Sequence, residues 1–337
     1  MADFKTVQVA RNAMSTRFEI VLHGNDEGAL RAAAEEAMNE IEALETQLSL
    51  YQSSSEIAHV NARGARGPVR VTPNVFRLLQ QAQKLSSETG GAFDITIAPL
   101  VRCWGFMDGA GGLPSDQQIE EARSRVGMHH MILDETNFSV QFDRDGVMLD
   151  LGAIGKGHAI ERAATLLREA GSTSAILHGG TSTVFAIGKP RDGDAWKVAI
   201  DNSPVTRDTE APKDRDATAP FSPAPEGKPG LLDVVFLRDE ALSVSAVWGK
   251  CFRADGKTYG HVLDPQSGQP ASRALLAAVV LPSATETDAF STALLALGSG
   301  GHDRIAGLRS GIRTWLLTPA VDDEPSRLEK RGSRTAA

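Results

Sequence analysis

An aspartate and a threonine near the carboxyl end of the sequence have the spacing and chemistry of a cation site. Asp288 and Thr292 are four residues apart in the segment TDAFSTALLALG, which has the composition of a helix. Side chains four apart leave the same face of a helix, and a carboxylate with a hydroxyl provides the hard oxygen ligands that Mg²⁺ prefers. Thr285 and Asp288 also fit the capping-box pattern Ser/Thr-x-x-Asp/Glu. The residues alone therefore leave a metal-binding role and a capping role open for Asp288.

A glycine-rich segment with a lysine is a candidate phosphate site. The sequence LDLGAIGKGHAI (149–160) runs from an apolar stretch into a predicted helix and places Lys156 between two glycines. Backbone N–H groups at a helix N-terminus, together with a cation, can bind a phosphate. The spacing matches neither the Walker A pattern nor the dinucleotide fingerprint. A tight strand-to-helix turn with a surface lysine is the alternative interpretation.

Four further positions lie in segments that could line a ligand site. Asp94 follows the glycines of GGAFDITIAPL, where it either forms a turn or binds a ribityl or ribose hydroxyl. His261 lies between the hairpin signal DGK and the proline turn DPQSG, and a lone histidine is either structural or a base near neutral pH. Met14, in MSTRF, and Tyr51, in SLYQSSSEI, could be core residues, and Tyr51 could also stack on a planar ring.

The elements that must position these residues show both helical and strand patterns. Apolar residues recur at helical spacing in several segments, and short apolar or β-branched runs predict strands between them. The helices are expected at 27–48, 73–88, 160–170 and 286–297, and the strands at 18–22, 147–151, 174–177, 231–236 and 241–247. The glycine pair at 90–91 is expected to end the second helix. This order implies an α/β or α+β architecture.

The charge balance of the chain excludes two classes of partner. Of its 337 residues, 35 are Lys or Arg and 43 are Asp or Glu, which gives a formal net charge of −8. A chain with that balance has no general basic field for nucleic acid or for anionic lipid. An anionic ligand would have to be bound locally, by a metal ion, a helix N-terminus or a few placed cations.

The sequence shows no sign of a membrane or a disulfide-rich protein. The two cysteines, Cys103 and Cys251, cannot form a disulfide framework, and no Cys/His cluster indicates zinc. No apolar run approaches the ~20 residues of a membrane-spanning helix. The N-terminal segment has neither a signal-peptide pattern nor a cysteine for lipid attachment. A cytoplasmic protein without a membrane span is therefore expected.

A single domain is expected over residues 1–320. Residues 204–230 are rich in Pro and Ala and have no hydrophobic period, which predicts a mobile surface insertion. The polar residues 321–337 are predicted to form a disordered tail.

Six segments of the chain resemble, in their order and spacing, the FAD:protein FMN transferases, the ApbE family. The resemblance covers about residues 10–318. The segments are MSTRFEI, SLYQSSSEIAHVN, GGAFDITIAPLVRCWGF, LDLGAIGKGHAIERA, HVLDPQSGQP and TDAFSTALLALG.

The resemblance implies a Mg²⁺-dependent enzyme that splits the diphosphate of FAD. Such an enzyme transfers FMN to a Thr or Ser hydroxyl of an acceptor flavoprotein through a phosphoester bond and releases AMP. The resemblance also implies an α+β, T-fold-like architecture of two lobes. In it, mixed sheets are flanked by helices, and FAD lies in the cleft between the lobes.

The resemblance further implies roles for particular residues. The metal ligands would be Asp288, Thr292 and the backbone carbonyl of Ala153. A Thr hydroxyl is a weak nucleophile that needs a base within reach; His261 is the candidate base, with Asp288 and Lys156 as further catalytic residues. Flavin and nucleotide contacts would come from Met14, Tyr51, Ala92, Phe93, Asp94, Asp150, Lys156, His261 and Val262.

Two segments depart from the family pattern. Thr181 follows a glycine pair where many relatives have aspartate, which removes a carboxylate near the expected nucleotide pocket. Residues 245–248 read SAVW where many relatives have TSG, which is expected to remove a glycine and a hydroxyl and to let Trp248 line the ligand site. Two alternatives stay open beside the transferase: an FAD pyrophosphatase that uses water as its nucleophile, and a non-catalytic flavin-binding protein.

Overall fold

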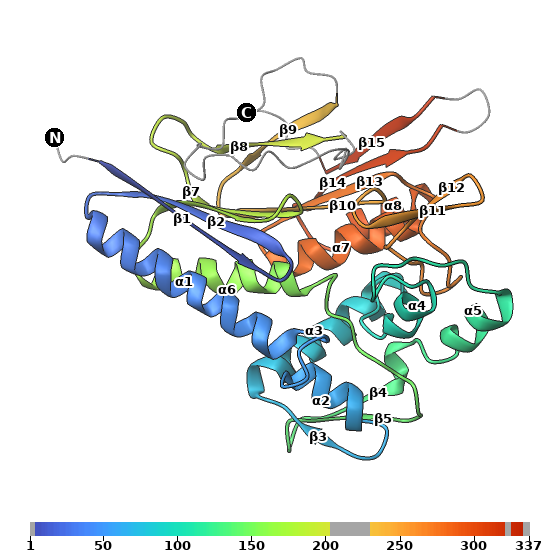
Figure 1. Ribbon diagram of the computed structural model, residues 1–337. Helices are drawn as coiled ribbons and strands as arrows, with labels where there is room; N and C mark the ends of the chain where they lie inside the picture. Colours follow the sequence, from blue (N-terminus) through green and yellow to red (C-terminus); the bar gives the residue numbers. More distant parts are fainter. Residues whose placement is uncertain (1–3, 203–229, 321–324, 333–337) are drawn as a thin grey trace.

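An eight-stranded antiparallel sheet forms the top of the molecule in Figure 1. The structure is a computed structural model that describes residues 4–202, 230–320 and 325–332. In spatial order the strands are β1 (Lys5–Ala13), β2 (Thr16–Gly24), β6 (Ser174–Gly179), β7 (Thr183–Gly188), β10 (Glu240–Ala246), β13 (Leu276–Leu281), β14 (Arg313–Thr318) and β15 (Arg327–Arg331).

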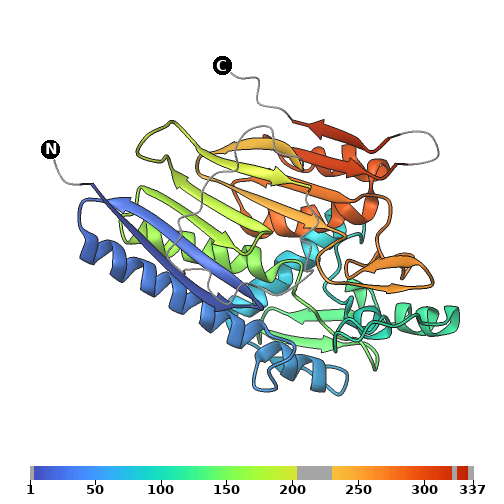
Figure 2. The ribbon, with the colours of Figure 1, turned by 45° about the horizontal axis from the view of Figure 1, so that its top comes forward.

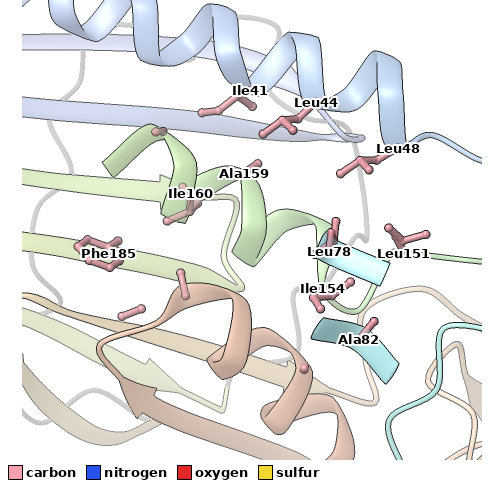
Figure 3. Close-up of a cluster of buried hydrophobic side chains, with 14 of the residues drawn as sticks. Ile41, Leu44, Leu48, Leu78, Ala82, Leu151, Ile154, Ala159, Ile160 and Phe185 are labelled. Atoms are coloured by element: carbon pink, nitrogen blue, oxygen red, sulfur yellow. The ribbon is translucent and has the colours of Figure 1, made fainter. Parts of the chain in front are cut away.

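Three helices cover one face of this sheet and lie below it in Figures 1 and 2. They are α1 (Glu27–Leu48), α6 (Gly155–Glu169) and α7 (Ala284–Leu297), and the short helix α8 (Ser299–Ala306) follows α7. Figure 3 shows Leu44 of α1 close to Ala159 of α6. α7 is buried on nearly all sides because it lies between α6 and the strands β10 and β13, which explains why its sequence is apolar all round.

A hairpin covers the opposite face of the sheet. It consists of β8 (Trp196–Asp201) and β9 (Leu231–Leu237), which pair antiparallel and lie above the sheet in Figure 2. Val198 and Val235 of the hairpin are buried in one cluster with Leu242 and Val280 of the sheet. These strands of the sheet are therefore buried on both faces. We call the sheet, its three helices and this hairpin the upper lobe.

A smaller group of elements, the lower lobe, lies beneath these helices in Figure 1. It contains α2 (Glu56–Arg63), α3 (Pro73–Thr89), the 3-10 helix Met128–His130 and a three-stranded sheet in the order β3 (Val69–Arg70), β5 (Ser139–Phe142), β4 (Met131–Asp134). One continuous cluster of buried side chains runs from Phe18 in β2 through Leu78 in α3 to Phe142 in β5. The two lobes therefore share one core.

A third group of elements holds the segment around His261. It contains α4 (Ala98–Cys103), α5 (Asp116–Arg123) and the hairpin β11 (Cys251–Ala254) and β12 (Lys257–Gly260). The ring of Tyr259 lies 5.3 Å from that of Phe252 and 5.5 Å from that of Trp104, measured between centroids. The indole N–H of Trp104 also donates to the carbonyl of Gly268 over 2.8 Å. The hairpin and the turn after it are thus fixed to α4.

The helices expected from periodicity are present, and local chemistry sets their ends. α1 spans 27–48 as predicted, and Asp26 caps it through its side chain. α3 has Pro73 in its first turn and ends at Gly90, whose φ of 69° suits glycine. The turn at 255–256 has two residues with positive φ and joins β11 to β12, as the hairpin signal predicted. Among the described helices, none combines the length and the apolar character that crossing a membrane requires.

The prediction of a strand at 147–151 is wrong. The segment is extended, but it makes a single parallel bridge, from Met148 to Ile97. The side chain of Asn61 takes the place of a neighbouring strand, because it accepts from the N–H of Leu149 over 2.7 Å and donates to its carbonyl over 3.0 Å.

The helix predicted from residue 160 begins earlier, at Gly155. Glycine is an unfavourable helix residue, so two glycines in the first turn suggested a loop. A hydrogen bond from Gly157 to the distant Asp288 stabilises this turn.

The α+β class is confirmed, but the sheets are not mixed. Every ladder between the described strands is antiparallel. Hairpins connect β1 to β2 and β6 to β7, and such tight connections require antiparallel neighbours. The helix pair α7 and α8 returns the chain so that β14 enters antiparallel to β13.

The disordered tail predicted for 321–337 is wrong for Arg327–Arg331, which form β15. This strand pairs with β14 from Thr318 to Thr314. Glu329 also accepts from the hydroxyl of Ser299 over 2.8 Å. Pairing with a sheet edge and this side-chain hydrogen bond order a segment whose polarity suggested a tail. Residues 204–229 of the predicted insertion lie outside the described residues.

The shared core gives a direct test of the fold. Phe18→Ala is expected to lower the free energy of unfolding by about 3–5 kcal/mol, because the ring is fully buried between β2 and the helices. Phe236→Ala in β9 is the matched control, since that ring is 52% exposed; it should cost about 0.5 kcal/mol or less. Urea unfolding measures both values, and equal losses would contradict the burial described here.

Candidate active site

The N-terminal turn of α6 meets the side of α7 at Gly157. The N–H of Gly157 donates to Oδ2 of Asp288 over 2.9 Å. A Cβ at this position would lie 2.3 Å from the carbonyl oxygen of Ala284 and 2.7 Å from Cβ of Asp288, so only glycine permits the approach. The glycine-rich segment therefore brings the positive end of a helix dipole onto a carboxylate.

Asp288 does not cap its own helix. The N-cap of α7 is Ser283, whose hydroxyl accepts from the N–H of Glu286 over 3.2 Å. The capping box expected from Thr285 and Asp288 is therefore wrong, because α7 begins at Ala284 and Asp288 falls in its second turn. The Asp288 side chain, in a residue only 4% exposed, is directed at α6.

Hard oxygen atoms suited to Mg²⁺ surround this contact. Thr292 lies one turn beyond Asp288 in α7, and its hydroxyl donates to the Asp288 carbonyl over 3.1 Å. Gly157 lies in the first turn of α6, where N–H groups have no acceptor within the helix, and its N–H donates to Asp288 instead. Ala153 lies just before the N-cap Ile154, so the Ala153 carbonyl is outside the helix. The described residues hold no cluster of three or more His, Cys, Asp or Glu side chains. A metal here would have one carboxylate, one hydroxyl and one carbonyl, which fits Mg²⁺.

A seam of hydroxyl groups between β10 and α7 was not predicted. Ser243 lies 2.9 Å from Thr287, and Ser245 lies 2.9 Å from Ser291. Two residues of strand and four of helix advance by similar distances, about 6.6 and 6 Å, so the alternation S-V-S could have indicated it. Ser245 also lies 3.3 Å from Thr292. The departure from the family pattern at 245–248 predicts the loss of a hydroxyl, but the hydroxyl of Ser245 is present beside a candidate metal ligand.

The lysine of the glycine-rich segment folds back onto its own loop. Lys156 Nζ donates to the carbonyl of Gly152 over 2.9 Å, and the N–H of Gly152 donates to Asp150 over 2.8 Å. Burial raises the pKa of Asp150, while the Gly152 hydrogen bond and the charges of Lys156 and Lys250 act to lower it. The charges of two lysines thus act on one carboxylate near the start of α6.

His261 lies opposite Lys250 at the base of the β11–β12 hairpin. Its N–H donates to the carbonyl of Lys250 over 2.9 Å, and its Nδ1 lies 3.1 Å from the same oxygen. Nδ1 also lies 3.3 Å from the backbone nitrogen of Lys250. It therefore donates to the carbonyl in the tautomer that leaves Nε2 with a free lone pair, and accepts from the N–H in the other tautomer. Burial lowers the pKa of His261 to about 4, and the charges of Lys156 and Lys250 act in the same direction. The ring is therefore neutral at neutral pH.

The loop after α3 lies beside the segment that leads into α6. The N–H of Asp150 donates to the carbonyl of Ile95 over 2.7 Å. Asp94 accepts from the N–H and the hydroxyl of Thr96 over 2.7 and 2.6 Å, which is the turn-forming role weighed from the sequence. Burial raises the pKa of Asp94, against these hydrogen bonds. Ala92 and Phe93 are 4% and 1% exposed, so their side chains belong to the core.

The remaining predicted contacts lie around this group. Tyr51 is 62% exposed, and partial burial followed by the charge of Asp150 raises its pKa. Met14 and Ser15 form the β1–β2 turn with φ of 49° and 59°, a costly conformation that concentrates at functional sites. Val262 packs against the main core. No hydrogen bond between described residues ties Met14 to the rest of the group.

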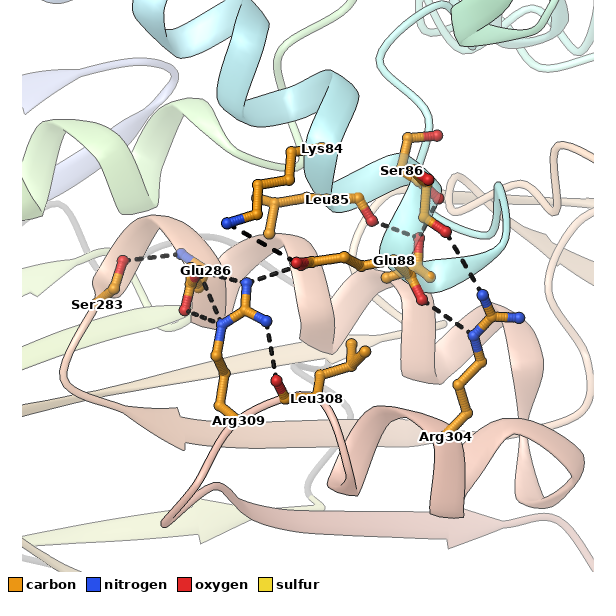
Figure 4. A network of polar contacts seen from close by, with 11 residues as sticks. Lys84, Leu85, Ser86, Glu88, Ser283, Glu286, Arg304, Leu308 and Arg309 are labelled. Carbon is orange, nitrogen blue, oxygen red and sulfur yellow. Dashed lines mark hydrogen bonds and ion pairs between the residues drawn. The ribbon is translucent and has the colours of Figure 1, made fainter.

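An ion-pair network, shown in Figure 4, joins the end of α3 to α7. Arg309 donates to Glu286 in α7 and to Glu88 in α3, both over 2.7 Å. Arg304 of α8 donates to the carbonyl of Glu88 over 3.0 Å. This carbonyl belongs to the last turn of α3, where a cation interacts favourably with the helix dipole. Glu88 lies just before Gly90, where α3 ends. The network therefore ties the loop with Asp94 to the helix with Asp288.

The two segments that depart from the family pattern lie in different surroundings. Thr181 is exposed at the turn between β6 and β7. Trp248 is partly buried against the core under the β8–β9 hairpin, on the sheet face away from α7. The expectation that Trp248 lines the ligand site stays a prediction.

Comparisons with known proteins agree with one another. Residues 14–314 match the ApbE family. The FAD:protein FMN transferase of Salmonella typhimurium is 26% identical over 309 residues, which cover 90% of this chain and 82% of that protein. The crystal structure of the ApbE protein of Thermotoga maritima has a TM-score of 0.80 at 23% identity, covering 97% of both chains. The Pseudomonas stutzeri flavinyl transferase ApbE, in its apo form, has a TM-score of 0.78 at 26% identity, covering 97% of this chain and 95% of that one.

The assignment of Asp288 as a metal ligand can be tested without an activity assay. Asp288→Asn keeps an oxygen that accepts from Gly157 but loses the charge that a cation needs. Mg²⁺ is expected to raise the melting temperature of the unmodified protein in the presence of FAD and to have no effect on this variant. Asp303→Asn, at an exposed position, is the control. An equal rise in melting temperature with Mg²⁺ in Asp288→Asn would show that Asp288 has a purely structural role.

The low pKa of His261 predicts a pH-dependent contribution to stability. Its folded pKa of about 4 lies below the ordinary value of about 6.5, so the unfolded chain takes up a proton first as the pH falls. The contribution of the neutral ring is complete above about pH 6.5 and decreases between pH 6.5 and 4. Urea unfolding at pH 7 and pH 4.5 should show a smaller acid loss in His261→Gln than in the unmodified protein. Identical losses would show that His261 is not buried as described.

Proposed function

The chain belongs to the ApbE family, and from this premise we propose that it is an FAD:protein FMN transferase. The enzyme cleaves the diphosphate of FAD, transfers FMN to a hydroxyl of an acceptor flavoprotein and releases AMP. Relatives named FAD:protein FMN transferase from Salmonella typhimurium and Escherichia coli match 90% and 92% of the chain. The observation that carries the proposal here is the contact of Asp288 with the first turn of α6, beside two lysines and a neutral histidine.

Mg²⁺ is the metal that suits this group of residues. Asp288, Thr292 and the Ala153 carbonyl would hold it, because they supply oxygen ligands with a single negative charge and leave room for phosphate oxygens. When bound, the ion supplies Lewis-acid stabilisation of the charge that develops on the diphosphate. The hydroxyl of Ser245, 3.3 Å from that of Thr292, orients the threonine ligand.

Lys156 and Lys250 bind the diphosphate by charge. The charges of both lysines act on Asp150 and on His261, and Lys156 Nζ donates to the carbonyl of Gly152, just before the N-terminal turn of α6. In a chain of net charge −8, such short-range attraction is what holds an anionic substrate.

His261 is the base for the acceptor hydroxyl. As the hydroxyl oxygen forms its bond to the phosphorus of FMN, its proton passes to Nε2 of His261, and the bond to the AMP phosphate breaks with its electron pair leaving on AMP. The step needs the tautomer with its proton on Nδ1, in which Nδ1 donates to the Lys250 carbonyl and Nε2 is free to accept. A bound diphosphate neutralises the two lysines that depress the pKa of His261, so the ring becomes a stronger base when substrate is present.

The flavin and nucleotide parts of FAD contact the loops around this centre. Tyr51 offers an exposed ring that can stack on a planar heterocycle. Asp94 and Asp150 offer carboxyl oxygens to hydroxyl groups. The backbone around Ala92, Phe93 and Val262 and the strained turn at Met14 complete the proposed set of contacts.

The proposal is tested by intact mass spectrometry. The purified chain is incubated with FAD, Mg²⁺ and a flavin-binding acceptor domain, and the acceptor is expected to gain one FMN group with an equal amount of AMP. An acceptor with its target Thr replaced by Val should gain nothing. His261→Gln should slow transfer by about 10²–10⁴-fold and leave FAD affinity within a few-fold of that of the unmodified enzyme.

Two other results would overturn the proposal and point to its alternatives. Release of FMN and AMP with no mass added to any acceptor would indicate an FAD pyrophosphatase. FAD that stays intact through hours with Mg²⁺ and acceptor would indicate a non-catalytic flavin-binding protein.

A further inference from the structure

A basic hollow lies on the lower lobe and contains none of the candidate active-site residues. It has a volume of about 550 Å³ and is formed by α2, β3 and the turn between them. Its lining includes the basic side chains His59, Arg63, Arg66 and Arg70 and no acidic one. We call this surface the basic hollow. It stands out because the chain as a whole carries a net charge of −8.

The three arginines of the hollow have no counter-charge among the residues that the structure describes. Their guanidinium groups form no hydrogen bond or ion pair with any residue that the structure describes, and all three are exposed. By contrast, Arg11 pairs with Glu42 and Arg309 pairs with Glu286. Like charges gathered in one place repel one another and do not help the chain to fold. Their clustering therefore indicates a counter-charge that a partner supplies.

The backbone under these arginines is rigid. The N–H of Arg66 donates to the carbonyl of Arg63 over 2.9 Å, and Arg70 pairs with Ser139 in the lower sheet. Gly64 packs so closely on the ring of Phe142 that a Cβ would lie 2.8 Å from it. A rigid support lowers the entropy cost of binding, so the hollow is suited to hold a ligand without rearranging.

The chemistry of the lining favours carboxylates. Guanidinium groups bind carboxylates through paired hydrogen bonds. Sites for single-stranded nucleic acid add aromatic rings on which bases stack, and the lining has no Phe, Tyr or Trp. A hollow also suits a protruding segment of a protein better than the flat surface of a bilayer.

We propose that the basic hollow binds an acidic segment of the acceptor protein during FMN transfer. This inference rests on the proposed function. α2 links the hollow to the candidate active site, because Asn61 forms two hydrogen bonds to Leu149, which adjoins Asp150. The loop that follows Tyr51 leads directly into the same helix. An acceptor docked here is held on the lobe that carries these flavin contacts.

A binding experiment tests the hollow without FAD or any acceptor. The probe is a fluorescein-labelled peptide of ten glutamates, titrated at low ionic strength and followed by anisotropy. The triple variant Arg63→Gln, Arg66→Gln, Arg70→Gln is expected to bind it at least about 10-fold more weakly. The matched control, Arg31→Gln, Arg238→Gln, Arg327→Gln, has the same net charge and exposed positions elsewhere. It should bind like the unmodified protein. Equal loss in both variants, or tighter binding of a ten-nucleotide uridine RNA, would overturn the proposal.

Transfer kinetics with a protein that gains FMN then test the role of the hollow. The triple variant should raise the KM for that acceptor about 10-fold, with kcat and the KM for FAD unchanged, and added salt should remove the difference. An unchanged acceptor KM would refute docking while leaving the transferase intact. If no protein gains FMN but the peptide still binds to the hollow, the transferase proposal fails, and with it the assignment of the acceptor as the partner.

Discussion

The close approach of α6 to α7 at Gly157 is the constraint on which the rest of the site depends. Helices usually pack 8–10 Å apart, at a distance set by their side chains, and the missing Cβ lets a backbone N–H reach the Asp288 carboxylate instead. A nearly buried carboxylate is costly unless it is hydrogen-bonded, and the positive end of α6 meets that need. The same bond satisfies a first-turn N–H of α6, a helix that begins with two glycines in its first turn. One tertiary hydrogen bond thus fixes the position of Asp288 relative to the start of α6.

Local positive charge in this acidic chain comes from a few groups at short range. Charges further apart than the Debye length, about 8 Å at physiological salt, are largely screened in water, so the net charge of −8 does not decide what binds in a partly buried site. The charges of Lys156 and Lys250 act on both Asp150 and His261, and the first turn of α6 donates to Asp288. The basic hollow is a second region of local positive charge. It differs from the candidate active site because no carboxylate of the described residues pairs with its arginines.

Sequence patterns predicted the parts of the structure that depend on neighbours in the chain. The periodicity gave the bounds of α1, and the spacing placed Asp288 and Thr292 on one helix. Predictions failed where distant residues decide: the first turn of α6 depends on a partner 131 positions away, and the segment at 147–151 is satisfied by a side chain 88 positions away. Lys250 was predictable but missed. A two-residue turn at 255–256 pairs 251 with 260, and one further step outward sets Lys250 opposite His261.

The Arg309 network explains how parts of the site from opposite ends of the chain keep their separation. Arg309 is bonded to Glu88 and Glu286, which are 221 and 23 positions away from it, and none of the three side chains is more than 24% exposed. Ion pairs at this depth are screened less than surface pairs, and the planar guanidinium imposes its own geometry on both carboxylates. Glu286 is two residues before Asp288, and Glu88 is two residues before the end of α3. A shift of α7 would therefore break a charge pair at the loop that carries Asp94, so the proposed metal ligand and the proposed flavin loop are held as one unit.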